Sequence, residues 1–149
     1  MENFILNEEV IIIKLFYEIK KDDFNRAGQA SSSIKKVLKQ LGIDAKIVRR
    51  IAIATYEAEM NVIIHSDGGS IEVDIEIERV IIRVCDRGPG IANIDLAMKA
   101  GYSTATEEIR ELGFGAGMGL PNIKRCSDEF SLDSIPGKYT KLKIVVYNR

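Results

Sequence analysis

Two clusters of glycine constrain this chain more than any other feature of its sequence. The first reads DRGPGI and contains Gly88 and Gly90. The second reads GFGAGMGL and contains Gly113, Gly115, Gly117 and Gly119. Glycine adopts positive φ without strain and lets a ligand approach the bare backbone. Each cluster adjoins an apolar segment, which suggests two walls of one pocket, although glycines can also serve only to form turns.

The second cluster leads directly into LPNIKRCSDEF, a segment whose apolar residues have helical spacing. A glycine loop before a helix presents free N–H groups to an anion, usually phosphate. Two familiar phosphate-binding motifs do not fit. Gly137-Lys138 is followed by Tyr139 where a P-loop requires Ser or Thr, and the polar segment before Gly113 is not the strand of a dinucleotide fingerprint. A nucleotide would therefore have to bind in another way.

The overall composition narrows the class of protein. With 149 residues, 46% hydrophobic and 29% charged, the chain is expected to form one globular domain over residues 1–149. Its net charge of −1 gives no reason to expect nucleic acid or a membrane as its partner. The two cysteines lack metal-binding spacing, and neither a signal peptide nor an apolar run of spanning length is recognised. A cytoplasmic protein is therefore expected.

Apolar periodicity divides the chain into strands and helices. Strands are predicted over residues 10–19, 71–77, 80–86 and 140–146. Helices are predicted from about residue 24 to 41, and from an Asp44 cap towards the Gly68-Gly69 pair. Strict alternation in residues 71–77 predicts a half-buried strand whose outer face is acidic.

Three polar residues follow one face of the second helix. Glu57, Asn61 and His65 are spaced at i, i+4 and i+8, so they form a single stripe. One interpretation is a solvated helix face. The other is a functional site, because the flanking residues are apolar and a buried carboxylate and amide need a partner. A metal ion, or a water held for chemistry, would supply that partner.

Two strand ends carry polar side chains that are expected to point toward the core. Asp86 alternates with the apolar residues of its strand and immediately precedes the first glycine cluster. Thr140 likewise alternates with the apolar residues of the last strand, at its start. A hydrogen bond between Thr140 and Asp86 is expected. An inward carboxylate beside glycines is a poor structural element and a good acceptor for a ligand.

Together these features resemble the conserved boxes of the GHKL superfamily of ATPases, which includes gyrase, histidine kinases and MutL. The matching segments are Glu57-x-x-x-Asn61, Asp86-x-Gly88-x-Gly90, residues 113–119 and Thr140. The resemblance extends from Asp44 to Val146. It implies an α+β fold of the Bergerat type, a two-layer α/β sandwich in which a mostly antiparallel mixed sheet packs on helices.

The resemblance also implies how ATP and Mg²⁺ would bind. Asn61 would hold Mg²⁺, Asp86 would accept a hydrogen bond from the adenine amino group, and Gly88 and Gly90 would admit the base. The further nucleotide-binding positions that it implies are Ile91, Tyr102, Ser103, Thr104, Gly115, Gly117, Met118, Gly119, Leu120 and Thr140. Residues 94–112 would form a lid. In the last box Tyr139 replaces the usual glycine, so a different floor of the adenine pocket is expected.

The segments AGYST and GAGMGLPNIKRCSDEF are most similar to the anti-sigma serine kinases of bacterial partner-switching modules. This implies an ATP:protein serine/threonine kinase whose substrate is a small STAS-type anti-sigma-factor antagonist, with Glu57 as the general base. The resemblance also suggests a sigma factor or a PP2C-type phosphatase as a further partner. It allows for a homodimer of this chain. The alternative function is an ATP-dependent anti-sigma factor or phosphatase-activating protein with little catalysis. A clamp ATPase of the gyrase kind would need a second domain.

Overall fold

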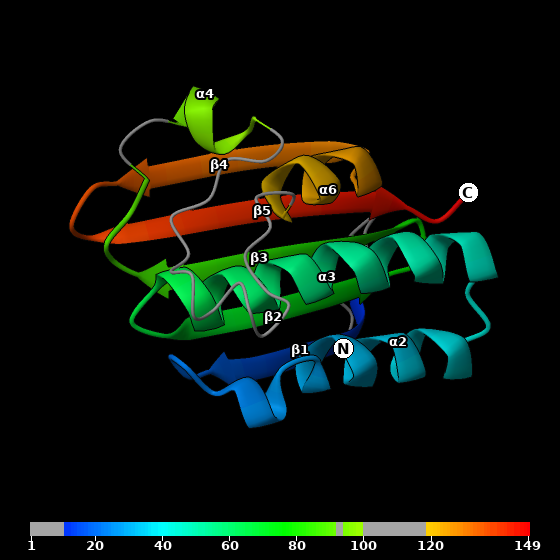
Figure 1. The fold of residues 1–149 in the computed structure, drawn as a ribbon. Coiled ribbons are helices and arrows are strands. Elements are labelled where there is room, and N and C mark those ends of the chain that lie inside the picture. Colours follow the sequence, from blue (N-terminus) through cyan, green and yellow to red (C-terminus); the bar gives the residue numbers. More distant parts are fainter. Residues whose placement is uncertain (1–10, 92–93, 100–118) are drawn as a thin grey trace, which may run out of the picture.

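A five-stranded antiparallel sheet forms the centre of the protein (Figure 1). The computed structural model describes residues 11–91, 94–99 and 119–149. The strands are β1 (Ile11–Ile19), β2 (Gly69–Glu76), β3 (Arg79–Arg87), β4 (Glu129–Ile135) and β5 (Tyr139–Tyr147), in the order β1-β2-β3-β5-β4. The predicted α+β sandwich is confirmed, and every neighbouring pair of these strands is antiparallel, so the described sheet contains no parallel pair.

Three helices lie on the same face of the sheet, with α3 between the other two (Figure 1). They are α2 (Gln29–Gln40), α3 (Ala45–His65) and α6 (Gly119–Cys126); the short helices η1 (Phe24–Arg26) and α4 (Ile94–Ala97) lie in connections. Asp44 caps α3 as predicted, because its carboxylate accepts a hydrogen bond of 2.8 Å from the Lys46 N–H. None of the described helices is both long and apolar enough to cross a lipid bilayer.

The core lies between the helices and the inner face of the sheet. The apolar residues of α3 that kept helical period are all buried: Ile47, Ile51, Ala54, Ala58 and Val62. They pack with the inward residues of β2, β3 and β5: Ile71, Val73, Ile75, Val80, Ile82, Val84, Leu142, Ile144 and Val146. Each large aliphatic side chain buried in this way contributes roughly 1.5–3 kcal/mol to stability. The sheet therefore presents its apolar residues to α3, and this packing holds the polar stripe of that helix in place.

The predicted first helix is interrupted at Gly28. This residue has a φ of +92°, so η1 ends before it and α2 begins after it. The Glu59 carboxylate of α3 stabilises this break by accepting hydrogen bonds from the backbone N–H groups of Gly28 (3.1 Å), Ala30 (3.3 Å) and Ser31 (3.1 Å). The break was not predicted because its acceptor comes from a different helix.

The acidic outer face of β2 is exposed only in part: Glu72 is exposed, whereas Asp74 and Glu76 are covered. Asp74 and Glu76 are only 7% and 6% exposed, although they alternate with the core residues of the strand. Arg83 lies 2.8 Å from the Asp74 carboxylate, and Arg79 lies 2.8 Å from that of Glu76. These guanidinium groups, both from β3, cover the carboxylates and neutralise them.

Candidate functional site

The polar stripe of α3 contacts α6. Asn122 donates a hydrogen bond of 3.3 Å from Nδ2 to Oε2 of Glu57. One turn along α3, Asn61 lies against the first residue of α6, since a Cβ added to Gly119 would come within 3.0 Å of Asn61 Oδ1. Glu57 and Asn61 are both partly buried. The two residues therefore do not form a plain solvated face.

His65 ends the same stripe at the last turn of α3. It is partly buried, and this burial lowers the pKa of its imidazole. The structure therefore favours a neutral ring at this position.

Asp86 lies at the end of β3, directly opposite Thr140 of β5. The pKa of Asp86 is raised to about 6. Burial is the largest cause, a hydrogen bond from the Thr140 backbone offsets part of the rise, and the charge of Asp67 adds to it. The predicted contact between Asp86 and Thr140 is therefore present through the backbone. The Thr140 hydroxyl instead hydrogen-bonds to Ser134 at 2.9 Å.

The first glycine cluster packs on the turn between β4 and β5. Gly88 and Gly90 have φ values of +27° and +74°, and a Cβ at Gly90 would lie 2.4 Å from the carbonyl oxygen of Ile135. The Ile91 N–H donates a hydrogen bond of 2.7 Å to Ser134 Oγ. Close backbone packing therefore requires glycine at position 90. A Cβ added to Gly88 would lie 3.6 Å or more from its nearest neighbours, so packing leaves room for a side chain there.

Tyr139 does not line the floor beside Asp86. Its hydroxyl donates a 3.1 Å hydrogen bond to Asp133, and the Lys141 ammonium lies 4.7 Å from its ring centroid. Tyr139 and Lys141 alternate along β5 with buried Thr140, which places them on the face of the sheet away from the core. The expectation that this replacement alters the pocket floor is therefore wrong, because the side chain leaves on the other side of the strand.

Several predicted positions lie outside the described residues. These are Tyr102, Ser103, Thr104, Gly115, Gly117 and Met118, together with most of the predicted lid. The last two positions of the second glycine cluster are described: Gly119 begins α6, and Leu120 is partly buried and packs against the core.

The residues at this site suit Mg²⁺ bound together with a nucleotide. Within residues 11–91, 94–99 and 119–149, no group of three or more His, Cys, Asp or Glu side chains could hold a metal ion. Mg²⁺ at nucleotide sites commonly takes one or two protein oxygens and completes its octahedron with phosphate and water. Asn61 offers such an oxygen, because its Oδ1 lies close to Gly119 at the start of α6.

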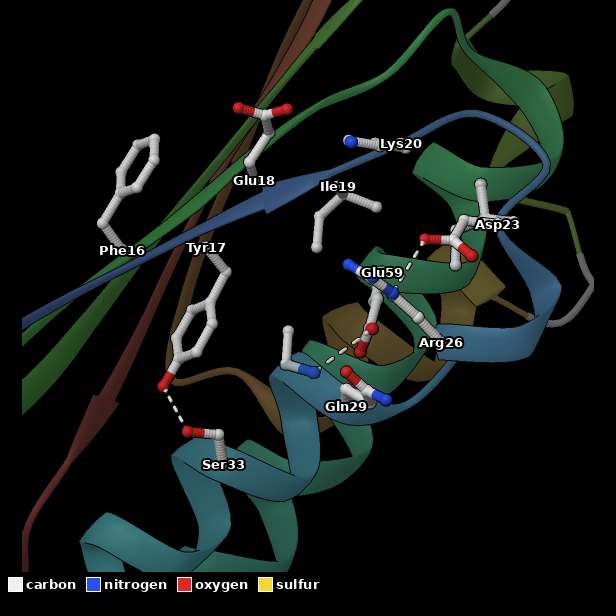
Figure 2. Close-up of a pocket in the computed structure, with 12 residues that line it drawn as sticks. Phe16, Tyr17, Glu18, Ile19, Lys20, Asp23, Arg26, Gln29, Ser33 and Glu59 are labelled. Atoms are coloured by element: carbon white, nitrogen blue, oxygen red, sulfur yellow. Dashed lines mark hydrogen bonds and ion pairs between the residues drawn. The ribbon is translucent and has the colours of Figure 1, made fainter.

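A separate cavity of about 380 Å³ lies between β1, α3 and the start of α2 (Figure 2). Tyr17, Ile19 and Arg26 are among the residues that line it, and Glu59 of α3 contributes to its wall. Glu59 is 2% exposed and does not belong to the polar stripe. It holds the start of α2 by three hydrogen bonds. No local pattern could reveal this, because its donors lie 28 to 31 residues earlier in the chain.

Comparisons with known proteins agree with this arrangement. Residues 21–146 match the family model described as the histidine kinase-like ATPase domain. The serine/threonine-protein kinase RsbT of Bacillus subtilis (strain 168) is 33% identical over 119 residues, which cover 77% of this chain and 84% of that protein. The anti-sigma F factor of Thermoanaerobacter sp. (strain X514) is 33% identical over 113 residues, covering 72% of this chain and 76% of that protein. The predicted class, kinases of the anti-sigma type, is confirmed by these relatives.

Solved structures share the fold at low sequence identity. The RsbU and RsbW domains of a Mycobacterium tuberculosis protein align with a TM-score of 0.60 at 16% identity, covering 89% of this chain and 31% of that one. The SiaB-SiaC complex of Pseudomonas aeruginosa aligns with a TM-score of 0.58 at 11% identity, covering 97% and 94%. Family model, relatives and fold agree, and the chain belongs to the histidine kinase-like ATPase family.

Proposed function

We propose that the protein is an ATP-dependent serine/threonine protein kinase that phosphorylates a small STAS-type anti-sigma-factor antagonist. The observation that carries this proposal is the pairing of Glu57 and Asn61, one helical turn apart and both in contact with the first turn of α6. A carboxylate beside a neutral amide oxygen combines a proton acceptor with a hard-cation ligand. The kinase RsbT and the anti-sigma F factor among the relatives support the same class.

Each residue of the site has a proposed role. Asn61 would hold Mg²⁺ through Oδ1, and the half-buried Asp86 carboxylate would accept a hydrogen bond from the adenine amino group. When bound, ATP supplies the γ-phosphoryl group and Mg²⁺ offsets the charge of the phosphates. Glu57 accepts the proton of the serine or threonine hydroxyl as that oxygen attacks.

The decisive experiment measures phosphoryl transfer from ATP to candidate antagonists encoded near this protein. We expect Glu57→Gln to bind ATP normally and to lose about 10²–10⁴-fold in transfer rate, which is the usual contribution of a general base. Glu72→Gln is the matched control, because Glu72 is an exposed carboxylate on β2. Transfer by Glu57→Gln at the parent rate would show that Glu57 is not the base.

A second function is supported by the relatives named anti-sigma F factor. In this case the domain sequesters a sigma factor, or activates a PP2C-type phosphatase, with ATP as a conformational ligand. The two functions separate in one comparison. A parent protein that binds a sigma factor in an ATP-dependent way, and phosphorylates none of the antagonists, would favour sequestration over the kinase.

A further inference from the structure

Two polar side chains of α6, Asn122 in its first turn and Arg125 in its last, form a hydrogen-bonded chain that the proposed reaction does not yet use. We infer that Asn122 is a positioning residue that orients the Glu57 carboxylate, and that Arg125 fixes the orientation of Asn122. This inference rests on the proposed role of Glu57 as general base. It assigns a function to α6 beyond contact with the nucleotide.

The direction of the hydrogen bonds follows from the chemistry of the three side chains. Arg125 is a donor only, and it donates from Nη2 to Oδ1 of Asn122. An ionised carboxylate is an acceptor only, so Glu57 requires the NH₂ end of the amide, which lies 3.3 Å from its Oε2. A flipped amide would place oxygen against carboxylate and NH₂ against guanidinium. Arg125 therefore holds Asn122 in the one orientation that serves Glu57.

The helix that carries Asn122 is held in place along its length. Ile123 is fully buried in the core, and Gly119 packs on Asn61 at the start of the helix. At the other end, Arg50 of α3 donates to the Cys126 carbonyl oxygen at 3.1 Å. A side chain on such an anchored helix is placed more accurately than one on a loop.

Orientation of Glu57 matters because a base must meet its proton at short range. The carboxylate lies at the end of a side chain with three rotatable bonds, and it acts only within about 2.6–3.2 Å of the hydroxyl oxygen. Asn122 holds Oε2, and Oε1 then accepts the proton. Loss of Asn122 should lower the transfer rate and leave substrate affinity unchanged.

The test compares variants of Asn122 in single-turnover phosphoryl transfer to the antagonist. We expect Asn122→Ala to lose roughly 10–100-fold in rate, the usual effect of removing a supporting partner, and less than Glu57→Gln loses. The KM for the antagonist and the affinity for ATP should stay near those of the parent. Asn122→Asp, which keeps the size but places a carboxylate against Glu57, should lose more. Lys124→Ala, at an exposed neighbour on α6, should transfer normally.

A double variant distinguishes positioning from a structural role. If Asn122 acts through Glu57, then Glu57→Gln combined with Asn122→Ala transfers no more slowly than Glu57→Gln alone. A structural defect would instead multiply the two losses. Multiplied losses, or a parent rate in both Asn122→Ala and Asn122→Asp, would overturn the inference.

The inference can fail separately from the proposed function. If the parent phosphorylates no antagonist, the kinase proposal fails, and the side-chain NH₂ resonances of Asn122 in ¹⁵N NMR decide the contact. These resonances should move in Glu57→Ala and stay in place in Glu72→Ala. An Asn122 NH₂ signal that is indifferent to Glu57→Ala would remove the contact and, with it, the positioning role.

Discussion

Glu59→Ala should destabilise the fold by about 2–4 kcal/mol. The Glu59 carboxylate accepts hydrogen bonds from three backbone N–H groups. Those of Ala30 and Ser31 are buried, and that of Gly28 is partly buried. Each buried N–H left without a partner costs about 1–3 kcal/mol, which gives about 2–6 kcal/mol for two. Burial also raises the pKa of Glu59, so removal of the carboxyl relieves a desolvation cost and offsets part of the loss.

Urea unfolding at neutral pH measures this effect directly. Thermal unfolding gives a second measurement. For a domain of this size each kcal/mol shifts Tm by about 2–4 °C, so the Tm of Glu59→Ala should lie roughly 4–16 °C below that of the parent. Glu59→Gln keeps one acceptor oxygen and should lose less. Glu72→Ala, at an exposed position, should stay within about 0.5 kcal/mol. A Glu59→Ala protein as stable as that control would refute the account of the break at Gly28.

Three further predictions concern the ligand site. Adenosine affinity should fall as pH drops below about 6, because protonation of Asp86 removes an acceptor; calorimetry should show this slope in the parent and none in Asp86→Asn. Because the pKa of Asp86 is raised in the folded protein, the stability that its carboxyl contributes is present at low pH and is lost as pH rises through about 6. Asp86→Asn should therefore be more stable than the parent in urea at neutral pH. Asn61→Ala should weaken Mg²⁺·ATP binding and spare adenosine binding, and equal weakening of both ligands would mean that Asn61 serves only the fold.

The sequence by itself determined the central helix, most of the strands and the family. In α3 and β2 the apolar residues recur at the period of one local structure, and local backbone geometry alone decides which of them share a face. The nucleotide boxes were visible for a similar reason, because each is a short segment with its own spacing. The roles of the residues within them, and the single domain over residues 1–149, stay predictions.

Only the tertiary structure decided which polar groups meet. Glu57 and Asn122 are 65 residues apart, and Glu59 lies 28 or more residues from the N–H groups whose hydrogen bonds it accepts. No local sequence pattern can link residues at such separations. The same holds for Asp74, which alternation placed on the outer face of β2 and which Arg83 covers. A buried carboxylate must find donors wherever packing brings them, and packing depends on the whole sheet and its helices. That is why the sequence revealed the positions of these side chains along their helices and strands, and only the fold revealed their partners.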